Sequence, residues 1–114
     1  TLQFSLTAVM ELVHAGLLSI EQLVQKMCHA PASLYQIANR GYIRPGYQAD
    51  LVLVNPTEEW TVNNDCILSK CGWSPMEGQT FHSKVEKTFV NGHLVYTDSQ
   101  VDANHRGQAL TFER

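Results

Sequence analysis

Five histidines are the residues of this chain best suited to metal or acid–base chemistry. Catalytic zinc is usually held by three clustered nitrogen, oxygen or sulfur ligands, with a further position open for water or substrate. No two histidines form a His-x-His pair, and the chain contains no His-Glu-x-x-His motif. The spacing therefore favours separate positions, with His14 and His29 near helix ends, where a cation suits the helix dipole. The five are His14, His29, His82, His93 and His105.

The three cysteines offer an alternative metal site. Cys66 and Cys71 are close in sequence, and His82 could be added to them as a third zinc ligand. The spacing is not that of a zinc knuckle and a fourth ligand is missing, so we expect two loop thiols. Cys28 ends an apolar helical stripe and is expected to lie in the core. An odd, sparse cysteine count indicates reduced thiols in a cytoplasmic setting.

Acidic residues could support acid–base catalysis, but their positions favour structural roles. Glu58 and Glu59 are adjacent, and Glu77 lies in a turn-rich stretch, which is typical of solvated turns. Asp50 directly precedes an apolar run. Its carboxylate is expected to accept backbone N–H bonds and to stabilise the turn before that run.

Basic and aromatic residues of the second half suggest anion binding or stacking on a ligand. Lys70 and Arg44 are single bases in loops, which usually face water. Trp60 and Trp73 bring large apolar areas to the stretch 57–80. We expect them to hold that stretch against other parts of the protein.

Composition limits the possible partners. The chain has 114 residues, a net charge of −3 and a pI near 5.9, so electrostatics favours neither nucleic acid nor an anionic membrane as partner. No apolar run reaches the roughly 18–20 residues of a membrane span. No secretory signal is visible, and a start at Thr1 is compatible with a piece of a longer protein.

The first 40 residues read as three amphipathic helices. The first covers residues 1–16, with Ser5 as N-cap and Gly16 as its stop. The second begins at Ser19, which forms a Ser-x-x-Gln capping box with Gln22, and extends to about residue 29. The third is short and begins at 30–31 with a proline. The residues expected to face inward are Leu6, Val9, Met10, Val13, Ile20, Leu23, Val24, Met27, Leu34, Tyr35 and Ile37.

Residues 41–114 read as strands and loops. The apolar run 51–54 predicts a strand covered on both faces. Asn91-Gly92 lies between the predicted strands 84–90 and 93–96 and predicts a type I′ hairpin. The stretch 57–80 is expected to be a long ordered loop with a helical turn at 64–69, and 97–114 a loosely ordered tail.

The turn segment 41–46 joins the two halves. It reads Gly-Tyr-Ile-Arg-Pro-Gly and leads into a strand, so it is not a phosphate-binding loop. The pattern Gly-x-Ile-x-x-Gly-x-x-Ala-Asp-Leu-Val-Leu over 41–53 resembles a signature near the C-terminus of the amidohydrolase superfamily. Later stretches resemble the end of a dihydroorotase: 59–62, 68–70, 73–78 and 85–92.

This resemblance implies an α+β fragment. Residues 1–40 would be the last helices of a (β/α)₈ barrel, and residues 41–114 would be strands, hairpin, loop and tail of the composite β-sandwich of such enzymes. Apolar faces would then be shaped for parts of a parent chain. Alone, the chain is expected to oligomerise, exchange strands or retain a partner fragment.

The resemblance implies the function of a parent enzyme. Dihydroorotases interconvert N-carbamoyl-L-aspartate and L-dihydroorotate with a bound divalent pair, usually zinc, and an aspartate that shuttles a proton. The family holds its metals with His-x-His, a carboxylated lysine and two more histidines, and none of these motifs occurs here. No catalytic, metal-binding or substrate-binding role therefore falls on this chain, which is expected to be an inactive scaffold. Alternatives are a hydantoinase-like or allantoinase-like tail, or a non-catalytic dihydroorotase-like assembly module.

Overall fold

The computed structural model describes residues 2–97 and 99–114. These residues fold into two compact units, each made of two separate stretches of chain. The first unit combines the chain up to Leu18 with Val54–Val85. The second combines Ser19–Leu53 with Glu86–Arg114. Two strands, introduced below as β1 and β4, cross from one unit to the other.

The first unit opens with a short 3-10 turn, η1 (Leu2–Phe4), that continues into helix α1 (Ser5–His14). Because η1 precedes it directly, Ser5 is already inside the helix and Phe4 is the N-cap, so the predicted Ser5 cap is wrong. The predicted stop is confirmed. Gly16 has a φ of +75°, and its N–H donates to the Val13 carbonyl, which is half of a Schellman motif.

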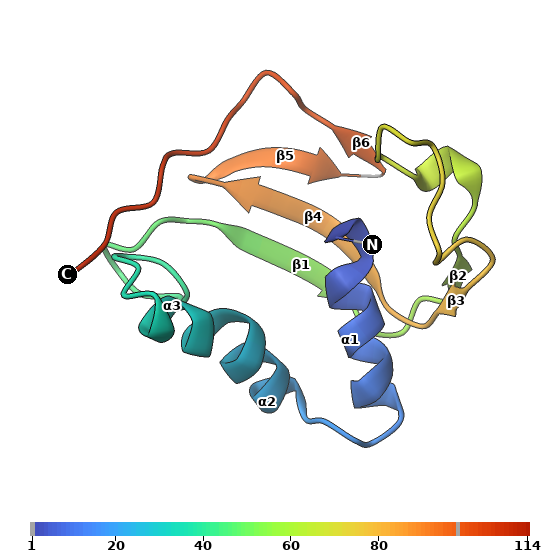
Figure 1. The fold of residues 1–114 in the computed structure, drawn as a ribbon, viewed down its shortest axis with the longest axis horizontal. Helices are drawn as coiled ribbons and strands as arrows, with labels where there is room; N and C mark the ends of the chain where they lie inside the picture. Colours follow the sequence, from blue (N-terminus) through green and yellow to red (C-terminus); the bar gives the residue numbers. More distant parts are fainter. Residues whose placement is uncertain (1, 98) are drawn as a thin grey trace. The chain divides into compact units, whose positions relative to one another are not determined.

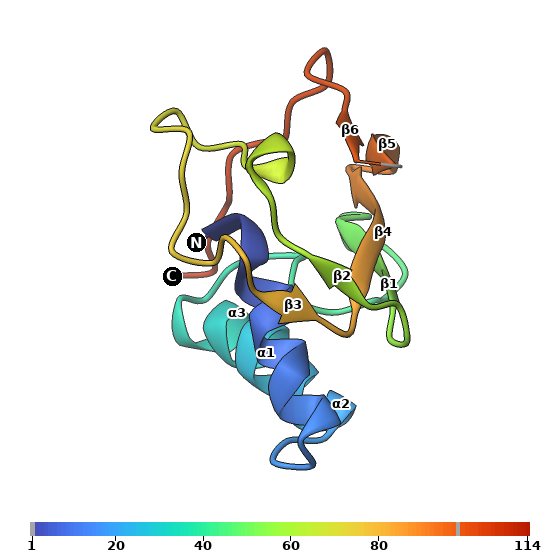
Figure 2. The same ribbon diagram turned by 90° about the vertical axis from the view of Figure 1, so that its right-hand side faces the viewer.

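A small antiparallel ladder completes this unit (Figure 2). Strand β2 (Trp60–Thr61) pairs with β3 (Thr80–Phe81), and a 3-10 turn, η3 (Asn64–Cys66), lies between them. The predicted turn at 64–69 is thus confirmed in its first part. The ladder itself was not predicted, because its two strands are two residues long and their pairing depends on contacts distant in sequence.

The core of this unit is aromatic. Phe4, Val62 and Phe81 are almost completely buried, and Trp60 packs against them. The Trp60 and Phe81 rings lie 5.4 Å apart. Burying aromatic side chains of this size stabilises the unit, because a large apolar area leaves water.

The second unit contains one continuous helical stretch (Figure 1). It consists of α2 (Ile20–Val24), a π-helical segment η2 (Gln25–His29) and α3 (Ala30–Leu34). The capping box of Ser19 and Gln22 is confirmed. The π-helical segment precedes Pro31, which has no N–H for the usual bond and whose ring would clash with the carbonyl four residues earlier.

One face of this stretch is more exposed than predicted. Leu23 and Ala32 are buried, but Leu34 is 75% exposed and Tyr35 is 56% exposed. Cys28 is also exposed rather than in the core. These predictions are wrong for this chain because the described residues do not cover that side of the helix. Ile37 is half-buried.

The sheet of the second unit has the order β1-β4-β5-β6 (Figure 1). Its strands are β1 (Leu51–Asn55), β4 (Lys84–Val90), β5 (His93–Thr97) and β6 (Gln100–Val101). The predicted hairpin between β4 and β5 is confirmed, since Asn91 and Gly92 have φ of +51° and +81° as a type I′ turn requires.

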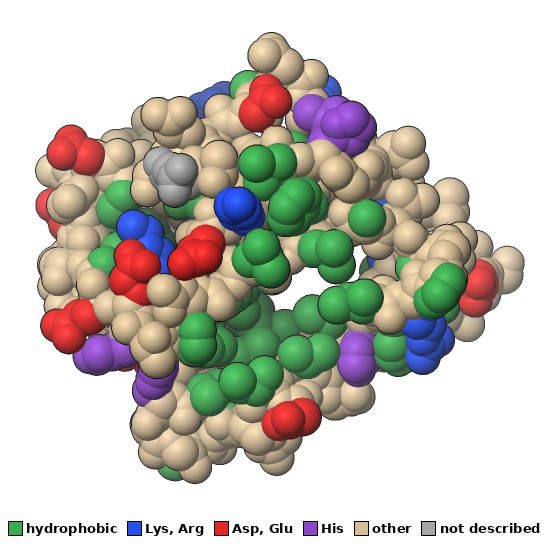
Figure 3. Space-filling model, turned by 180° about the vertical axis from the view of Figure 1, so that it is seen from behind, with side chains coloured by type: hydrophobic (Ala, Val, Ile, Leu, Met, Phe, Trp, Pro, Cys, Tyr) green, Lys and Arg blue, Asp and Glu red, His purple; other side chains and the backbone are tan. Residues whose placement is uncertain are grey.

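Strand β1 forms where it was predicted but is not covered on both faces. It is an edge strand, and Leu51, Val52 and Leu53 are 37%, 45% and 50% exposed. Hydrophobic side chains consequently lie open at the surface (Figure 3). The apolar run identified a strand correctly, but its environment depends on other layers of structure.

The tail contains one short strand, β6, and one bridge over its described residues; Asp98 lies outside them. Ile37 and Phe112 form an antiparallel bridge. The N–H of Ala38 donates to the Thr111 carbonyl at 2.8 Å. A long-range pairing of this kind leaves no local sequence signal and was not predicted; most of the described tail is irregular, and its expected looseness stays a prediction.

None of the described helices has both the length and the apolar character that crossing a membrane requires.

Candidate functional site

The structure separates the histidines into different environments. In the second unit, His29 stacks on Tyr42 with ring centroids 4.1 Å apart, and His93 stacks on His105 at 3.8 Å. In the described ranges, no group of three or more His, Cys, Asp or Glu side chains is arranged to hold a metal ion. The candidate site of Cys66, Cys71 and His82 is therefore not assembled.

The cysteines make local contacts instead. The Cys66 thiol donates to the carbonyl of Asn63 at 3.1 Å, inside the η3 turn. Cys71 is exposed, and its sulfur lies 3.2 Å from the Ser69 hydroxyl. This hydrogen bond lowers the pKa of the Cys71 thiol, because a hydroxyl that donates to sulfur stabilises the thiolate.

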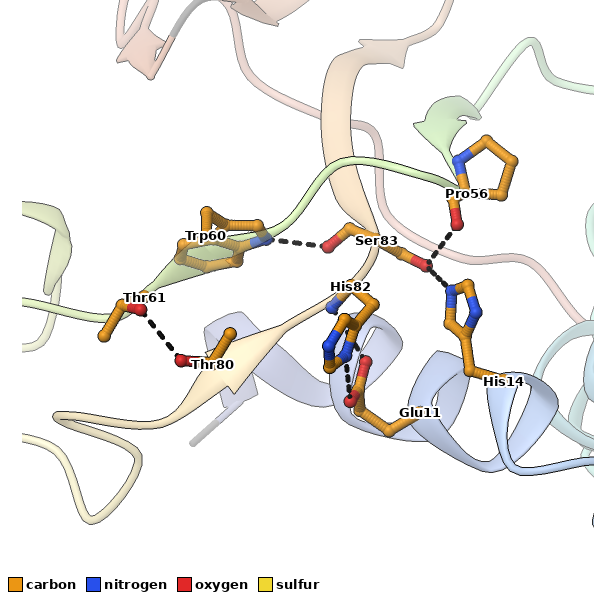
Figure 4. A network of polar contacts seen from close by, with 8 residues as sticks. All are labelled: Glu11, His14, Pro56, Trp60, Thr61, Thr80, His82 and Ser83. Atoms are coloured by element: carbon orange, nitrogen blue, oxygen red, sulfur yellow. Dashed lines mark hydrogen bonds and ion pairs between the residues drawn. The ribbon is translucent and has the colours of Figure 1, made fainter.

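The densest polar cluster of the first unit joins α1 to the residues between β3 and β4 (Figure 4). Glu11 accepts two hydrogen bonds from His82. The backbone N–H of His82 donates to Glu11 Oε2 at 2.9 Å, and the ring Nδ1 lies 2.9 Å from Oε1. Glu11 lies on the side of α1 that faces β3, so helix periodicity and strand position together create this contact.

Glu11 and His82 shift each other's pKa. Partial burial alone would raise the pKa of Glu11, but the hydrogen bonds from His82 and the charges of His82 and His14 outweigh it and lower that pKa. The hydrogen bond and the negative charge of Glu11 raise the pKa of His82. The side chains of Glu11 and His82 are 26% and 51% exposed, so solvent screens much of this attraction.

Ser83 lies at the centre of the neighbouring contacts. Its side chain is fully buried, and its hydroxyl lies 2.9 Å from His14 Nε2 and 3.5 Å from the Pro56 carbonyl. Its own carbonyl accepts a bond of 2.7 Å from the Trp60 indole N–H. Every one of these contacts is internal, so Ser83 holds α1, β2 and the turn at Pro56 together.

This cluster contains serine, histidine and an acid, but it is not a nucleophilic triad. A triad needs one imidazole that bridges the serine hydroxyl and the carboxylate. Here Ser83 contacts His14, whereas Glu11 contacts His82. Ser83 is also 0% exposed, so a substrate carbonyl has no access to its oxygen. The geometry supports a structural role for the cluster.

Asp50 accepts a backbone N–H in the second unit, but its main-chain partner lies in a different turn from the one predicted. Its carboxylate accepts the N–H of Asn91 at 2.9 Å and forms an ion pair with Arg40. The prediction that Asp50 accepts backbone N–H bonds is confirmed. The turn that it contacts is the one between β4 and β5, and not the turn from Gly46 as predicted.

The other charged and aromatic candidates make structural contacts. The Arg44 guanidinium lies 4.0 Å from the centre of the Tyr42 ring. Glu58 pairs with Lys84 at 3.5 Å rather than only facing water. Trp60 holds its part of the 57–80 stretch as expected, but Trp73 is 61% exposed. Lys70, Glu59 and Glu77 are exposed.

The sequence did not reveal the cluster of Glu11, His14, His82 and Ser83. Its two side-chain contacts to histidine span 71 and 69 residues. The only available signal was the helical position of Glu11 and His14, three residues apart on one side of α1.

Comparisons with curated proteins point to one family. The sequence matches the Amidohydrolase family over residues 2–95. It is 44% identical over 88 residues to the dihydroorotase of Clostridioides difficile (strain 630). These aligned residues are 77% of this chain and 20% of that protein. It is 31% identical over 112 residues to the dihydroorotase of Pyrococcus abyssi. Here the aligned residues are 98% of this chain and 28% of that protein.

Solved structures share the fold. A D-hydantoinase structure superposes with a TM-score of 0.77 at 22% identity, over 84% of this chain and 21% of that one. L-Hydantoinase (dihydropyrimidinase) from Arthrobacter aurescens gives a TM-score of 0.74 at 29% identity, over 80% and 20%. The chain thus spans 20–28% of the length of these relatives. With its α+β architecture and a family match over residues 2–95, the chain belongs to the amidohydrolase family.

Proposed function

We propose that this chain is the C-terminal segment of a dihydroorotase, which interconverts N-carbamoyl-L-aspartate and L-dihydroorotate in pyrimidine biosynthesis. The observation that carries the proposal is the 44% identity to the Clostridioides difficile dihydroorotase over 88 residues. The Pyrococcus abyssi dihydroorotase supports it over 98% of the chain. Relatives named dihydroorotase also occur in several further bacteria.

In this proposal the chain is a scaffold for the parent enzyme. Residues 1–40 would be the final helices outside a (β/α)₈ barrel, and 41–114 would belong to the composite sandwich. The uncovered apolar side chains of α3 and β1 support this role, because such surfaces normally pack against another layer. A rigid support of this kind helps to hold an active site in its productive geometry.

The metal of such an enzyme would be bound by other parts of the parent. The described residues do not fit a zinc centre, because no three potential ligands converge and the Glu11–His82 pair is used internally. We therefore assign no catalytic, metal-binding or substrate-binding role to residues of this chain. The segment alone is expected to be inactive.

A hydantoinase-like parent is the second candidate, and a specific observation favours it. The two superposed structures described above are hydantoinases, with TM-scores of 0.77 and 0.74. Their sequence identities of 22% and 29% are below the 44% found with the dihydroorotase, which is why we rank dihydroorotase first. An allantoinase-like parent and a non-catalytic assembly module remain as further alternatives.

A chimaera distinguishes these candidates. Residues 2–95 would replace the matching segment of the Clostridioides difficile dihydroorotase, and dihydroorotate hydrolysis and zinc content would be measured. Retained activity supports a dihydroorotase scaffold. The matched control carries the corresponding segment of the Arthrobacter aurescens L-hydantoinase and is expected to lose activity. A soluble, zinc-loaded but inactive chimaera with this chain would contradict the proposal.

The proposal extends to partners and setting. The chain would assemble with the rest of its parent, and as an isolated segment it would form homo-oligomers through its open apolar surfaces. A net charge of −3 gives no electrostatic reason to add nucleic acid or an anionic membrane to these partners. A cytoplasmic setting agrees with the free state of Cys28, Cys66 and Cys71.

A further inference from the structure

Two contacts join α1 to the segment between β3 and β4, and each depends on a histidine (Figure 4). His82 contacts Glu11, and His14 contacts Ser83. We propose that these four residues form a latch controlled by protonation. The latch holds α1 against the His82–Ser83 segment while the His82 ring is positively charged, and it loosens when that ring loses its proton. This inference concerns the chain itself and does not depend on the proposed function.

The geometry of Glu11 makes His82 the switch. The backbone N–H of His82 donates to Glu11 at any pH, at 2.9 Å. The ring Nδ1, also at 2.9 Å, donates in the imidazolium but in only one of the two neutral tautomers. Loss of the proton therefore removes the ionic attraction and leaves the second hydrogen bond dependent on the tautomer.

The contact of His14 with Ser83 has a different donor arrangement. The buried hydroxyl of Ser83 has one proton, which it can donate to the Pro56 carbonyl at 3.5 Å. Its oxygen then accepts a bond from His14 Nε2 at 2.9 Å. This arrangement suits both the charged His14 ring and its neutral Nε2–H tautomer. His14 consequently anchors the latch, and His82 controls it.

The surrounding charges favour a protonated His82. The His14 ring lies 5.9 Å from the His82 ring, and a positive charge there would oppose one on His82. Glu11 and Glu59 both favour that charge. Glu58 and Lys84 pair with each other at 3.5 Å and largely cancel. The His82 side chain is 51% exposed, so protons reach it from solvent while the latch is closed.

The direction of the pH dependence follows from the linkage between proton binding and the stability of the latched state. Contact with Glu11 raises the pKa of His82, so the latched state binds this proton more tightly than the open state does. The stabilisation is complete below the His82 pKa of the open state, as long as Glu11 stays ionised. It is lost as the pH rises through the His82 pKa of the latched state.

Amide hydrogen exchange of His82, followed by NMR from about pH 5 to 8 and corrected for intrinsic rates, tests the latch in the 114-residue chain. Protection should fall as His82 deprotonates. Its decrease in logarithmic units should equal the difference between the His82 pKa in the wild type and in Glu11→Gln. Glu11→Gln should abolish the step, whereas the control Glu21→Gln, in the first turn of α2, should retain it.

Two results would overturn the latch. The first is protection of the wild-type His82 amide that stays level across this pH range, or an equal step in Glu11→Gln. The second needs no variant and guards against misfolding of Glu11→Gln. An NMR titration of the wild-type His82 ring that gives a pKa at or below its ordinary value of 6.5 would remove the driving force.

Discussion

Asp50 Oδ1 accepts a hydrogen bond of 2.9 Å from the backbone N–H of Asn91, 41 residues later in the chain. The same carboxylate forms an ion pair with Arg40, whose guanidinium also donates to the Gln108 carbonyl at 3.2 Å. One partly exposed acid thus connects the turn before β1, the turn between β4 and β5, and the tail. This connection joins the start of β1 to the turn between β4 and β5, although the apolar side chains of Leu51, Val52 and Leu53 are 37–50% exposed.

Replacement of Asp50 should destabilise this unit. Asp50→Ala removes the acceptor of the Asn91 N–H and the ion-pair partner of Arg40, which keeps only its bond to Gln108, and should lower the free energy of unfolding by about 1–3 kcal/mol. Asp50→Asn keeps an oxygen for Asn91 but removes the charge, so it should cost less. Urea unfolding followed by circular dichroism measures both. Two variants as stable as the wild type would show that the contacts of Asp50 contribute nothing to the free energy of unfolding.

Gly41 and Gly46 form a matched pair for testing a close backbone approach. Both have positive φ, +87° and +84°. A Cβ at Gly41 would contact Ala32 and lie 2.9 Å from the Cys28 carbonyl oxygen, whereas a Cβ at Gly46 would meet nothing within 4 Å. Gly46→Ala should cost about 1–2 kcal/mol from the backbone alone. Gly41→Ala should cost about 1–3 kcal/mol more in thermal or urea unfolding, because of the clash. Equal costs would mean that the helical segment with Cys28 and Ala32 shifts to accommodate the new methyl group without a measurable loss of stability.

Phe81 should dominate the stability of the first unit. It is completely buried between Phe4 and Trp60, so Phe81→Ala should cost about 3–5 kcal/mol. Trp73→Ala removes a larger aromatic side chain that is 61% exposed, and it should change stability little. Chemical unfolding of the two variants in parallel distinguishes burial from aromatic content. A larger loss for Trp73→Ala would contradict the assigned core.

Cys71 should be the most reactive thiol near neutral pH. The hydrogen bond with Ser69 lowers its pKa, which increases the fraction of thiolate at a given pH below that pKa. Alkylation by iodoacetamide, located by mass spectrometry, should label Cys71 before Cys28, which is also exposed. Ser69→Ala should raise the Cys71 pKa and slow its labelling, and should leave Cys28 unaffected. Unchanged labelling of Cys71 in that variant would assign its reactivity to exposure alone.

The edge strand β1 should drive self-association of the isolated chain. Unpaired edge strands with apolar side chains offer a template for another chain, and a lysine on such an edge opposes that pairing. Val52 is 45% exposed on β1, so Val52→Lys should shift the chain toward monomer in sedimentation velocity. Leu17→Lys, at a side chain that is 75% exposed beyond the end of α1, is the control and should not. A wild-type chain that is monomeric at all concentrations would refute this prediction.

Residues close together in sequence determined much of the secondary structure. The Ser19–Gln22 capping box, the Gly16 stop and the Asn91–Gly92 turn all formed as predicted. Each of these signals is contained within a few neighbouring residues, whose backbone preferences and hydrogen bonds do not depend on distant parts of the chain. The apolar run 51–54 likewise identified its strand.

Only the tertiary structure decided which side chains meet and which stay uncovered. Glu11 reaches His82 across 71 residues, and Ile37 pairs with Phe112, because the fold brings these segments side by side. The exposure of β1 and Leu34 could not be predicted from the sequence either. An apolar pattern indicates a face that can be buried, but it does not indicate which layer covers that face. Local preferences are properties of a short peptide, whereas burial and long-range pairing depend on how the whole chain folds.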